Sequence, residues 1–276
     1  MTVFNVSSGD LTKTMMPTVS KSYTIYQILT IVSDNFLILC SRVFRNRIAL
    51  VIITVSSSGE FINSTEPIIN LEVNESSYYF RSADYDAESN TVYIGGQLDY
   101  HLEVILVYNF TSFTASIINN NTKSWDTQLA SGCMNSQTYY LMDLTKSGNY
   151  TLEIYDININ TELPTLSVVG IPQDSTSFVL CYNNQVYVAS SSLVTLGDLS
   201  LLQINLQTGE ASKLYESSAD VISTYNYWVY ENYFTQMVEI NNQYYLITVD
   251  FNRSVIVYQV EITKFFVVEA ITYYIK

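Results

Sequence analysis

The sequence is short of charge, above all of positive charge. Only 14% of its 276 residues are Asp, Glu, Lys or Arg, whereas an ordinary soluble domain carries about 25%. The 26 acidic residues outnumber the 12 Lys and Arg residues, and the formal net charge is −14. Phosphate backbones and anionic lipid surfaces are bound by basic patches, so this balance counts against nucleic acid and against anionic membranes as partners.

Residues that hold metals or carry catalysis are also scarce. The single histidine, His101, cannot supply a three-ligand metal site, and no GxSxG or HExxH motif is present. Cys40, Cys133 and Cys181 show no CxxC spacing and cannot build a disulfide framework. At most one pair bridges, and buried free thiols are the commoner outcome. We therefore expect no metal and no cofactor, and a non-enzymatic role is favoured over an enzymatic one.

Leader, membrane-spanning and linker segments are not found either. The first twenty residues have neither the basic nor the apolar region of a secretory signal peptide. The apolar stretch 23–40 is interrupted by Ser33, Asp34 and Asn35 and is too broken to span a bilayer. With 9 Gly and 4 Pro the chain has no linker, so residues 1–276 are expected to form a single domain. A virion or cytoplasmic location is expected, and the oligomeric state stays open.

What the sequence does have is a repeated β-strand pattern. A Tyr or Ile is followed by a polar, an apolar and a second polar residue, and then by a polar or glycine-containing turn. Alternation with a period of two marks a strand that is buried on one face. Repeats of roughly 40–50 residues are typical of propeller blades. The five copies begin at Ile53, Tyr108, Tyr155, Ile204 and Tyr258.

This pattern predicts an all-β fold, a five-bladed β-propeller with four-stranded antiparallel blades. Residues 1–20 are expected to be an N-terminal arm or a strand that closes the last blade. Asn183-Asn184 and Asn241-Asn242 are expected in tight hairpins, because Asn tolerates the positive φ of such turns. The stretch 221–230, before the last blade, is expected to be an additional strand or an insertion.

The second predicted blade resembles a kelch repeat. Gly95-Gly96 is expected to end its second strand, Val107-Tyr108 follows after a loop, and Phe113 comes a few residues later. This order is similar to the double glycine, Tyr and Trp of kelch blades, and the resemblance implies a binding platform and occasionally an enzyme. The composition, poor in charge and rich in Tyr, Asn, Ser and Thr, resembles that of proteins from hyperthermophilic acidophilic archaea and their viruses.

Propeller topology also gives a candidate contact region. The loops between the second and third strands of the blades lie on one face, and here they are expected to hold four of the five arginines. An arginine fork binds carboxylates, phosphates or acidic protein surfaces. The alternative is that these side chains are solvated or paired with Asp99, Asp198 and Asp250, which is common at surfaces. The predicted binding residues are Arg42, Arg45, Arg47, Asp99, His101 and Arg253.

Three further patterns carry less weight. Asp84, Asp86 and Glu88 alternate as in a calcium loop, but Ser89 stands where Gly is expected, so a solvated hairpin turn is favoured. Paired carboxylates for glycoside hydrolysis are conceivable, although no pair stands out. Acceptor sequons for N-glycosylation occur at Asn5, Asn63, Asn74, Asn109, Asn120, Asn149 and Asn252.

The sequence thus predicts a non-enzymatic binding or scaffold module. Its partner is expected to be another protein or a surface glycan, and the module is expected in a virion or on an acid-exposed surface. The alternative is a carboxylate-dependent glycoside hydrolase with its site in the central channel.

Overall fold

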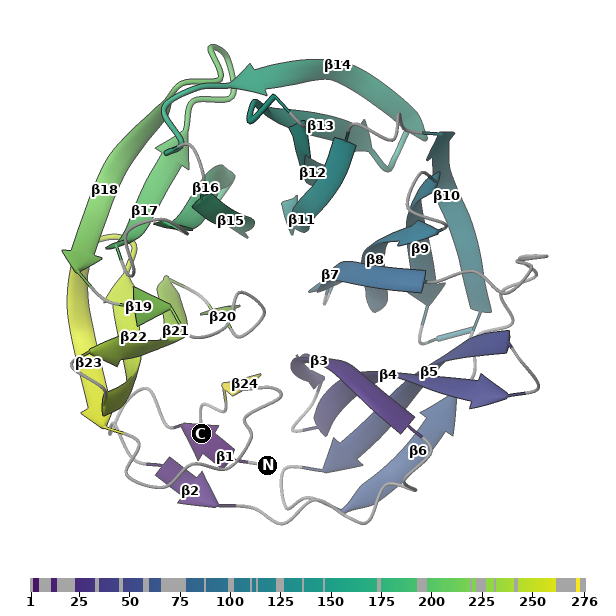
Figure 1. Cartoon of the computed structure of the whole chain (residues 1–276). Helices are drawn as coiled ribbons and strands as arrows, with labels where there is room; N and C mark the ends of the chain where they lie inside the picture. Colours follow the sequence, from purple (N-terminus) through teal and green to yellow (C-terminus); the bar gives the residue numbers. More distant parts are fainter. Residues whose placement is uncertain are drawn as a thin grey trace. The chain divides into compact units, whose positions relative to one another are not determined.

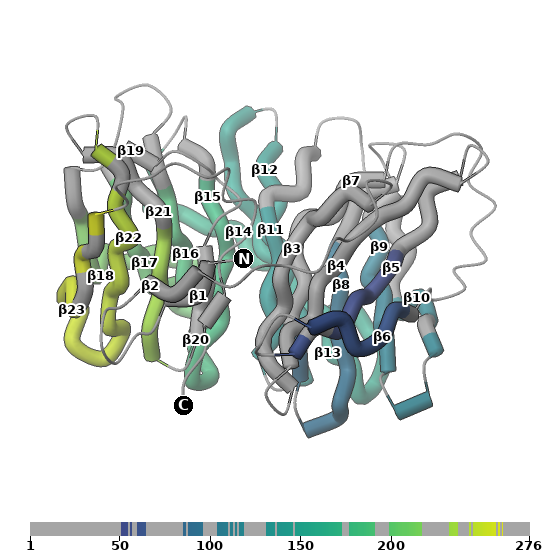
Figure 2. Tube along the Cα trace, turned by 90° about the horizontal axis from the view of Figure 1, so that it is seen from below, coloured from purple at the N-terminus to yellow at the C-terminus, as the bar shows by residue number. Residues whose placement is uncertain are grey.

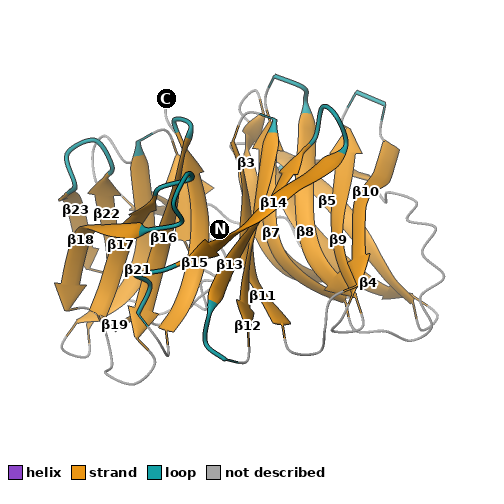
Figure 3. Ribbon diagram, turned by 90° about the horizontal axis from the view of Figure 1, so that it is seen from above, coloured by secondary structure: helices purple, strands orange, loops and turns teal. Residues whose placement is uncertain are grey.

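The computed structural model places strands and turns along most of the chain (Figure 3). No helix in the part of the chain that it describes is long and apolar enough to cross a membrane. The described residues are 2–4, 11–13, 23–32, 35–44, 47–56, 60–65, 78–86, 88–98, 102–109, 111–112, 114–122, 127–135, 137–145, 147–172, 175–192, 198–218, 220–221, 227–230, 232–240, 243–261 and 272–273.

The chain divides into two compact units, each of which is described by itself. The first unit comprises Met1–Asp99, Val104–Asn120 and Phe266–Lys276. The second unit comprises Tyr100–Glu103 and Asn121–Phe265.

Two sheets of the first unit are antiparallel meanders, in which each strand pairs with the next one along the chain (Figure 1). Val51, Ile52 and Ile53 are all buried, as expected for an inner strand that has neighbours on both faces. The first meander is β3 (Tyr23–Val32), β4 (Asn35–Phe44), β5 (Arg47–Ser56) and β6 (Phe61–Thr65). The second is β7 (Tyr78–Asp86), β8 (Thr91–Leu98), β9 (Leu102–Asn109) and β10 (Thr114–Thr122), whose strand ends reach slightly beyond the unit.

A third sheet of the first unit joins the two ends of the chain. β1 (Thr2–Phe4) pairs antiparallel with β2 (Leu11–Lys13). On its other side β1 pairs parallel with β24 (Thr272–Tyr273), with Val3 opposite Thr272.

The second unit begins with two further four-stranded meanders. Between β15 and β16, Asn183 and Asn184 have φ values of 46° and 58°, which confirms the tight turn expected there. The first meander is β11 (Thr127–Asn135), β12 (Thr138–Thr145), β13 (Tyr150–Asp156) and β14 (Thr161–Val168). The second is β15 (Ser175–Tyr182), β16 (Gln185–Ser192), β17 (Asp198–Ile204) and β18 (Ala211–Ser218).

The last sheet has five strands, and its strand order differs from the order that the predicted position of Arg253 implies. They are β19 (Asp220–Val221), β20 (Tyr227–Tyr230), β21 (Tyr233–Ile240), β22 (Gln243–Asp250) and β23 (Val255–Glu261). Both β19 and β20 pair with the same side of the sheet, along β21. The stretch 221–230 therefore contributes to the first strand position of the sheet. This makes β22 the third strand position, whereas the predicted placing of Arg253 between a second and a third strand required β22 to be the second.

The fold is all-β and propeller-like, built from antiparallel meanders that follow one another in chain order. Four of the described sheets are four-stranded antiparallel meanders, which agrees with the expected form of the blades. The expected number of five such blades is wrong, because the other two described sheets have five strands and three. Gly95 and Gly96 do not end a strand, since β8 continues to Leu98. They lie opposite a register shift between Phe80 and Ser82 of β7.

The three sheets of the second unit pack through two separate cores. The first core lies between the β11–β14 and β15–β18 sheets and includes Met142, Leu152 and Val188. The second lies between the β15–β18 and β19–β23 sheets and includes Leu201 and Phe234. The central β15–β18 meander therefore buries both of its faces against its two neighbours, as propeller blades do.

A backbone clasp reinforces the first of these packing contacts. The Val169 N–H donates to the Gly209 carbonyl over 3.0 Å, and the Ala211 N–H donates to the Val169 carbonyl over 2.8 Å. Gly209 has a φ of +77°, and a Cβ on it would collide with the Ser167 carbonyl oxygen. Glycine is required here because its backbone is left-handed and because the backbone of Ser167 approaches it closely.

Candidate binding surface

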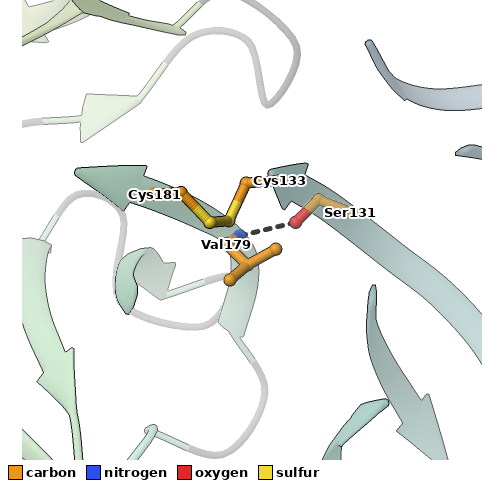
Figure 4. The surroundings of a disulfide bond; sticks show 4 residues. All are labelled: Ser131, Cys133, Val179 and Cys181. Atoms are coloured by element: carbon orange, nitrogen blue, oxygen red, sulfur yellow. Dashed lines mark hydrogen bonds between the residues drawn. A yellow bond between two sulfur atoms is a disulfide. The ribbon is translucent and has the colours of Figure 1, made fainter. Parts of the chain in front are cut away.

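The relative direction of β11 and β15 decides which turns of the second unit share an end. The Val179 N–H of β15 donates to the Ser131 Oγ of β11 over 2.5 Å, and two residues further along both strands Cys133 forms a disulfide with Cys181 (Figure 4). The two strands therefore run parallel. In antiparallel meanders, the turns after the first and third strands then lie at this same end in both sheets.

The last sheet brings one more turn to that end. Phe251, in the turn between β22 and β23, stacks on Tyr182 at the end of β15, with ring centroids 5.3 Å apart and planes 10° apart. Figure 2 shows this turn at the end of its sheet. We call the four turns 156–160, 183–184, 205–210 and 250–254 the turn face of the second unit.

The three longer turns of the turn face share one hydrogen-bonded design. Each begins with an Asp or Asn whose Oδ1 accepts the N–H groups of the residues two and three positions later. The distances are 2.9 and 3.3 Å at Asp156, 2.9 and 3.3 Å at Asn205, and 2.8 and 3.3 Å at Asp250. Each turn ends in a residue with positive φ, namely Asn160, Gly209 or Ser254. These Asx turns satisfy their own backbone and hold the turn in one shape.

Two of these turns are also tied to the hairpin beside them. The Ile157 N–H donates to the Gln137 carbonyl over 2.9 Å, and the Phe251 N–H donates to the Asn232 carbonyl over 2.8 Å. Asn232 Nδ2 also donates to Asp250 Oδ1 over 2.9 Å. These hydrogen bonds fix the backbone of the turns 156–160 and 250–254, from which the exposed side chains project.

The exposed side chains of the turn face are mostly amides, with a few apolar groups among them. Ile159 is 63% exposed, and Val255, directly after the last turn, is 46% exposed. Amide side chains both donate and accept hydrogen bonds, so they can meet the polar groups of a protein or a sugar. The exposed amide residues are Asn158, Asn160, Asn183, Asn184, Asn205, Gln207 and Asn252.

An aromatic cluster supports the turn face from below. Phe251 contacts Tyr187 with ring centroids 4.6 Å apart and Phe234 with centroids 6.5 Å apart. Burial raises the pKa of the Tyr187 phenol, and neighbouring Tyr182 raises it further. Tyr182 is only half-buried, so it connects this cluster with the exposed Asn183 and Asn184.

The structure describes only part of the predicted arginine site. Arg42 and Arg47 lie on β4 and β5, where Arg42 pairs with Ala49 and Arg47 with Phe44. Their side chains lie outside the described part, as do Arg45, Asp99 and His101 altogether. This part of the site stays a prediction.

Arg253 lies in the turn after the third strand position, not in a loop after the second. Its side chain is 75% exposed, and its Nε lies 3.7 Å from Oδ2 of the buried Asp250. The pairing with Asp250 that the sequence offered as the alternative to ligand binding is therefore confirmed.

The alternating acidic residues of β7 form another Asx turn. Asp86 Oδ1 accepts the Glu88 N–H over 3.0 Å, and Asp86 Oδ2 accepts the Ser89 hydroxyl over 2.5 Å. The Tyr85 hydroxyl donates to Asn90 Oδ1 over 2.9 Å and closes the turn. Asp84 pairs with Tyr93, and its side chain is not described. No group of three His, Cys, Asp or Glu suited to a metal ion is found among the described residues.

The buried Asp143 and the half-buried Glu153 lie close together in the second unit. Asp143 of β12 is 2% exposed and pairs with Thr151, while Glu153 of β13 pairs with Leu141. The two acids are thus diagonal neighbours on one face of the sheet, a position that separates residues by about 7–8 Å. Both residues already take part in an interaction. Burial and pairing are typical of acids that organise a sheet.

Sequence reasoning missed the turn face because it assigned the contact region to the loops at the other end of the blades. A signal for it was present. Tyr155-Asp156 and Ile204-Asn205 each place an Asp or Asn directly after the strand anchor, and Asn160 and Gly209 follow four residues later. An Asp or Asn followed four residues later by Asn or Gly is the signature of such a turn.

No protein-family model matches the chain, so the kelch resemblance finds no support there. No curated protein matches it in sequence either.

Solved structures match the chain in fold at low identity. A nidogen/laminin complex contains a chain with 11% identity and a TM-score of 0.53, over 86% of this chain and 80% of that one. A puromycin hydrolase matches with 7% identity and a TM-score of 0.55, over 88% of this chain and 38% of its own length. A puromycin-hydrolyzing peptidase from Mycobacterium tuberculosis matches with 10% identity and a TM-score of 0.54, over 90% and 39%.

At this identity the likenesses show the fold alone. The chain spans about two fifths of the length of the two hydrolytic proteins.

Proposed function

We propose that the chain is a non-enzymatic binding module that uses the turn face of its second unit to hold another protein or a surface glycan. The observation that carries the proposal is the combination of fixed turns with exposed side chains. Asp156, Asn205 and Asp250 hold the backbone, while Ile159 and Val255 project from it. A surface that is already ordered loses little conformational entropy on binding.

The composition of the turn face supports a mainly uncharged mode of recognition. Most of its exposed residues carry amides, its exposed cation Arg253 is already paired with Asp250, and Glu210 is an exposed acid. Apolar groups surrounded by hydrogen-bonding groups are typical of the centre and rim of protein interfaces. A nidogen/laminin complex among the structural matches favours protein binding by analogy of fold.

The test compares the two ends of the second unit. Ile159→Asp combined with Val255→Asp places charge on the turn face, and Ser147→Asp places it on the turn between β12 and β13, at the opposite end. The wild type and both variants are used to capture partners from the cells that produce the protein. We expect the wild type and Ser147→Asp to retain the same partner and the turn-face variant to lose it. Equal capture by all three would contradict the proposal.

The hydrolase remains a second candidate because Asp143 and Glu153 form a carboxylate pair. They are diagonal neighbours on one face of the sheet, and glycoside hydrolysis needs two carboxyl groups in the same site. The wild type and Asp143→Asn are assayed for reducing-sugar release from a panel of polysaccharides. Release by the wild type that Asp143→Asn abolishes would favour the hydrolase, and no release by either would remove it.

A further inference from the structure

The outer strand β6 of the first unit exposes two large apolar side chains. Phe61 is 53% exposed and Ile62 is 51% exposed. Among the described strands β6 pairs with β5 alone, so it forms the edge of its sheet. An edge strand that carries exposed apolar side chains invites pairing with other chains, and proteins protect such edges.

The next residue along the strand is a glycosylation acceptor. Asn63, Ser64 and Thr65 form a complete Asn-x-Thr sequon, and Asn63 is exposed. Asn63 Oδ1 accepts the N–H of Ser64 over 2.8 Å, and its Nδ2 makes no hydrogen bond with the described residues. Nδ2 is the atom that a sugar would be linked to, and it is available here.

A separate observation points to the compartment in which such sugars are attached. Cys133 and Cys181 form a disulfide in the second unit. Disulfides form and persist in oxidising compartments, and they are therefore common in secreted and cell-surface proteins. N-glycosylation is likewise a mark of secreted and surface proteins.

We propose that Asn63 carries an N-linked glycan that covers Phe61 and Ile62 on the edge of the β3–β6 sheet. Asn63 Nδ2 loses a proton and bonds to the anomeric carbon of a sugar, while the lipid diphosphate of a lipid-linked oligosaccharide leaves. The glycan hydrates the edge and prevents a second chain from pairing with β6.

The same criteria divide the other described sequons. Asn252 lies in a turn and is exposed, so it is an acceptor as well. Asn149 is exposed too, but its Nδ2 donates to Ser147 Oγ over 3.0 Å, so the criteria do not select it. Asn109 is not an acceptor, because its side chain holds a turn together. Its Oδ1 accepts the N–H groups of Thr111 and Ser112 over 2.9 and 3.0 Å, and its Nδ2 donates to the Thr91 hydroxyl over 3.4 Å.

The first test is made on protein isolated from the cells or particles that produce it. Peptide-N-glycosidase treatment in ¹⁸O-labelled water converts a glycosylated Asn to labelled Asp, which peptide mass spectrometry detects. We expect the label at Asn63 and Asn252 and none at Asn109. Unlabelled Asn63 in the treated protein would overturn the proposal.

The second test separates the glycan from the residue that carries it. Thr65→Ala destroys the sequon but keeps Asn63, and Thr111→Ala is the matched control at Asn109. In a host that glycosylates the wild type, Thr65→Ala should lose one glycan by mass and self-associate on size-exclusion chromatography, whereas Thr111→Ala should match the wild type. Adding Phe61→Ser and Ile62→Ser to Thr65→Ala should restore the monomer. A Thr65→Ala protein that loses the glycan without self-association would refute the covering role.

Discussion

The central sheet of the second unit, β15–β18, is held to its two neighbours in different ways. Towards β11–β14 it uses a disulfide, a hydrogen bond between the first strands and a backbone clasp at Gly209. Towards β19–β23 it uses an aromatic cluster centred on Phe251. An apolar core lies at both contacts, and the first adds directional links to it where the second adds aromatic packing.

The state of the first strand explains the difference. β11 is continuous, so it can run beside β15 and bond to it at Ser131 and Cys133. In the last sheet the corresponding position is divided between β19 and β20, two short strands with a separate pairing along β21. Phe251 reaches across from a turn instead. Where regular backbone alignment is lost, a large side chain supplies the contact.

Removing Phe251 is expected to have the largest effect. Phe251→Ala would leave a cavity between Tyr187 and Phe234, and such changes cost about 3–5 kcal/mol of unfolding free energy. Urea denaturation measures the loss. As a control, Val169→Ala changes an exposed side chain and should cost about 0.5 kcal/mol or less. A loss at Phe251 as small as the control would mean that the aromatic cluster does not hold the second contact.

Breaking the disulfide is expected to rank next. Cys133→Ser combined with Cys181→Ser releases a link between residues 48 positions apart, and we expect a loss of about 3 kcal/mol. Thermal unfolding with and without reductant measures it. The wild type should be destabilised by reductant, and the double variant should not respond. A wild type that ignores reductant would show that packing alone secures the first contact.

The hydrogen bond from Val179 to Ser131 is expected to contribute less. Ser131→Ala would leave the buried N–H of Val179 without its acceptor, which costs about 1–3 kcal/mol. Amide hydrogen exchange provides the specific readout, because the Val179 amide should exchange faster while the amides of β22 keep wild-type rates. Unchanged exchange at Val179 would argue against the bond.

The smallest expected effect is a decrease of the unfolding free energy at alkaline pH. It tests the role of Tyr187 in the contact between β15–β18 and β19–β23. Burial raises the pKa of Tyr187 in the folded state. Below pH about 10 its phenol is protonated in both the folded and the unfolded chain, so it does not affect stability there. Above that pH the unfolded state loses the proton first, and the stability falls as the pH rises. Tyr187→Phe should therefore flatten the decline of urea midpoints above pH 10. An equally steep decline in the variant would exclude Tyr187 as a source.

Period-two alternation was sufficient to find most of the strands. The hairpin at Asn183-Asn184 was predicted because its turn chemistry is local and needs no partner from elsewhere in the chain. The last sheet was misassigned because β19 and β20 are too short to alternate visibly. The first four copies of the repeat begin in the third strand of their sheets. The fifth copy was placed at Tyr258, which lies in the fourth strand, β23.

The candidate surface was harder to predict than the strands. The prediction counted β22 as a second strand although it is the third, and successive turns lie at opposite ends of a meander. Arg253 was therefore assigned to the wrong end of its sheet. The pairing of Cys133 with Cys181 depends on two strands that come side by side only after folding, so spacing could not choose it over free thiols. The burial of Asp143 and Asp250 likewise depends on their neighbours and not on the residues around them in sequence.

The pairing of β1 with β24 has a consequence for how the chain matures. Its two partners are the first and last described strands, so the ribosome must synthesise all the residues between them before they can meet. Contacts between such distant residues are entropically slow to form. Until then β1 has, of its two described neighbours, only β2 beside it, and the edge that later receives β24 stays open to pairing with other chains.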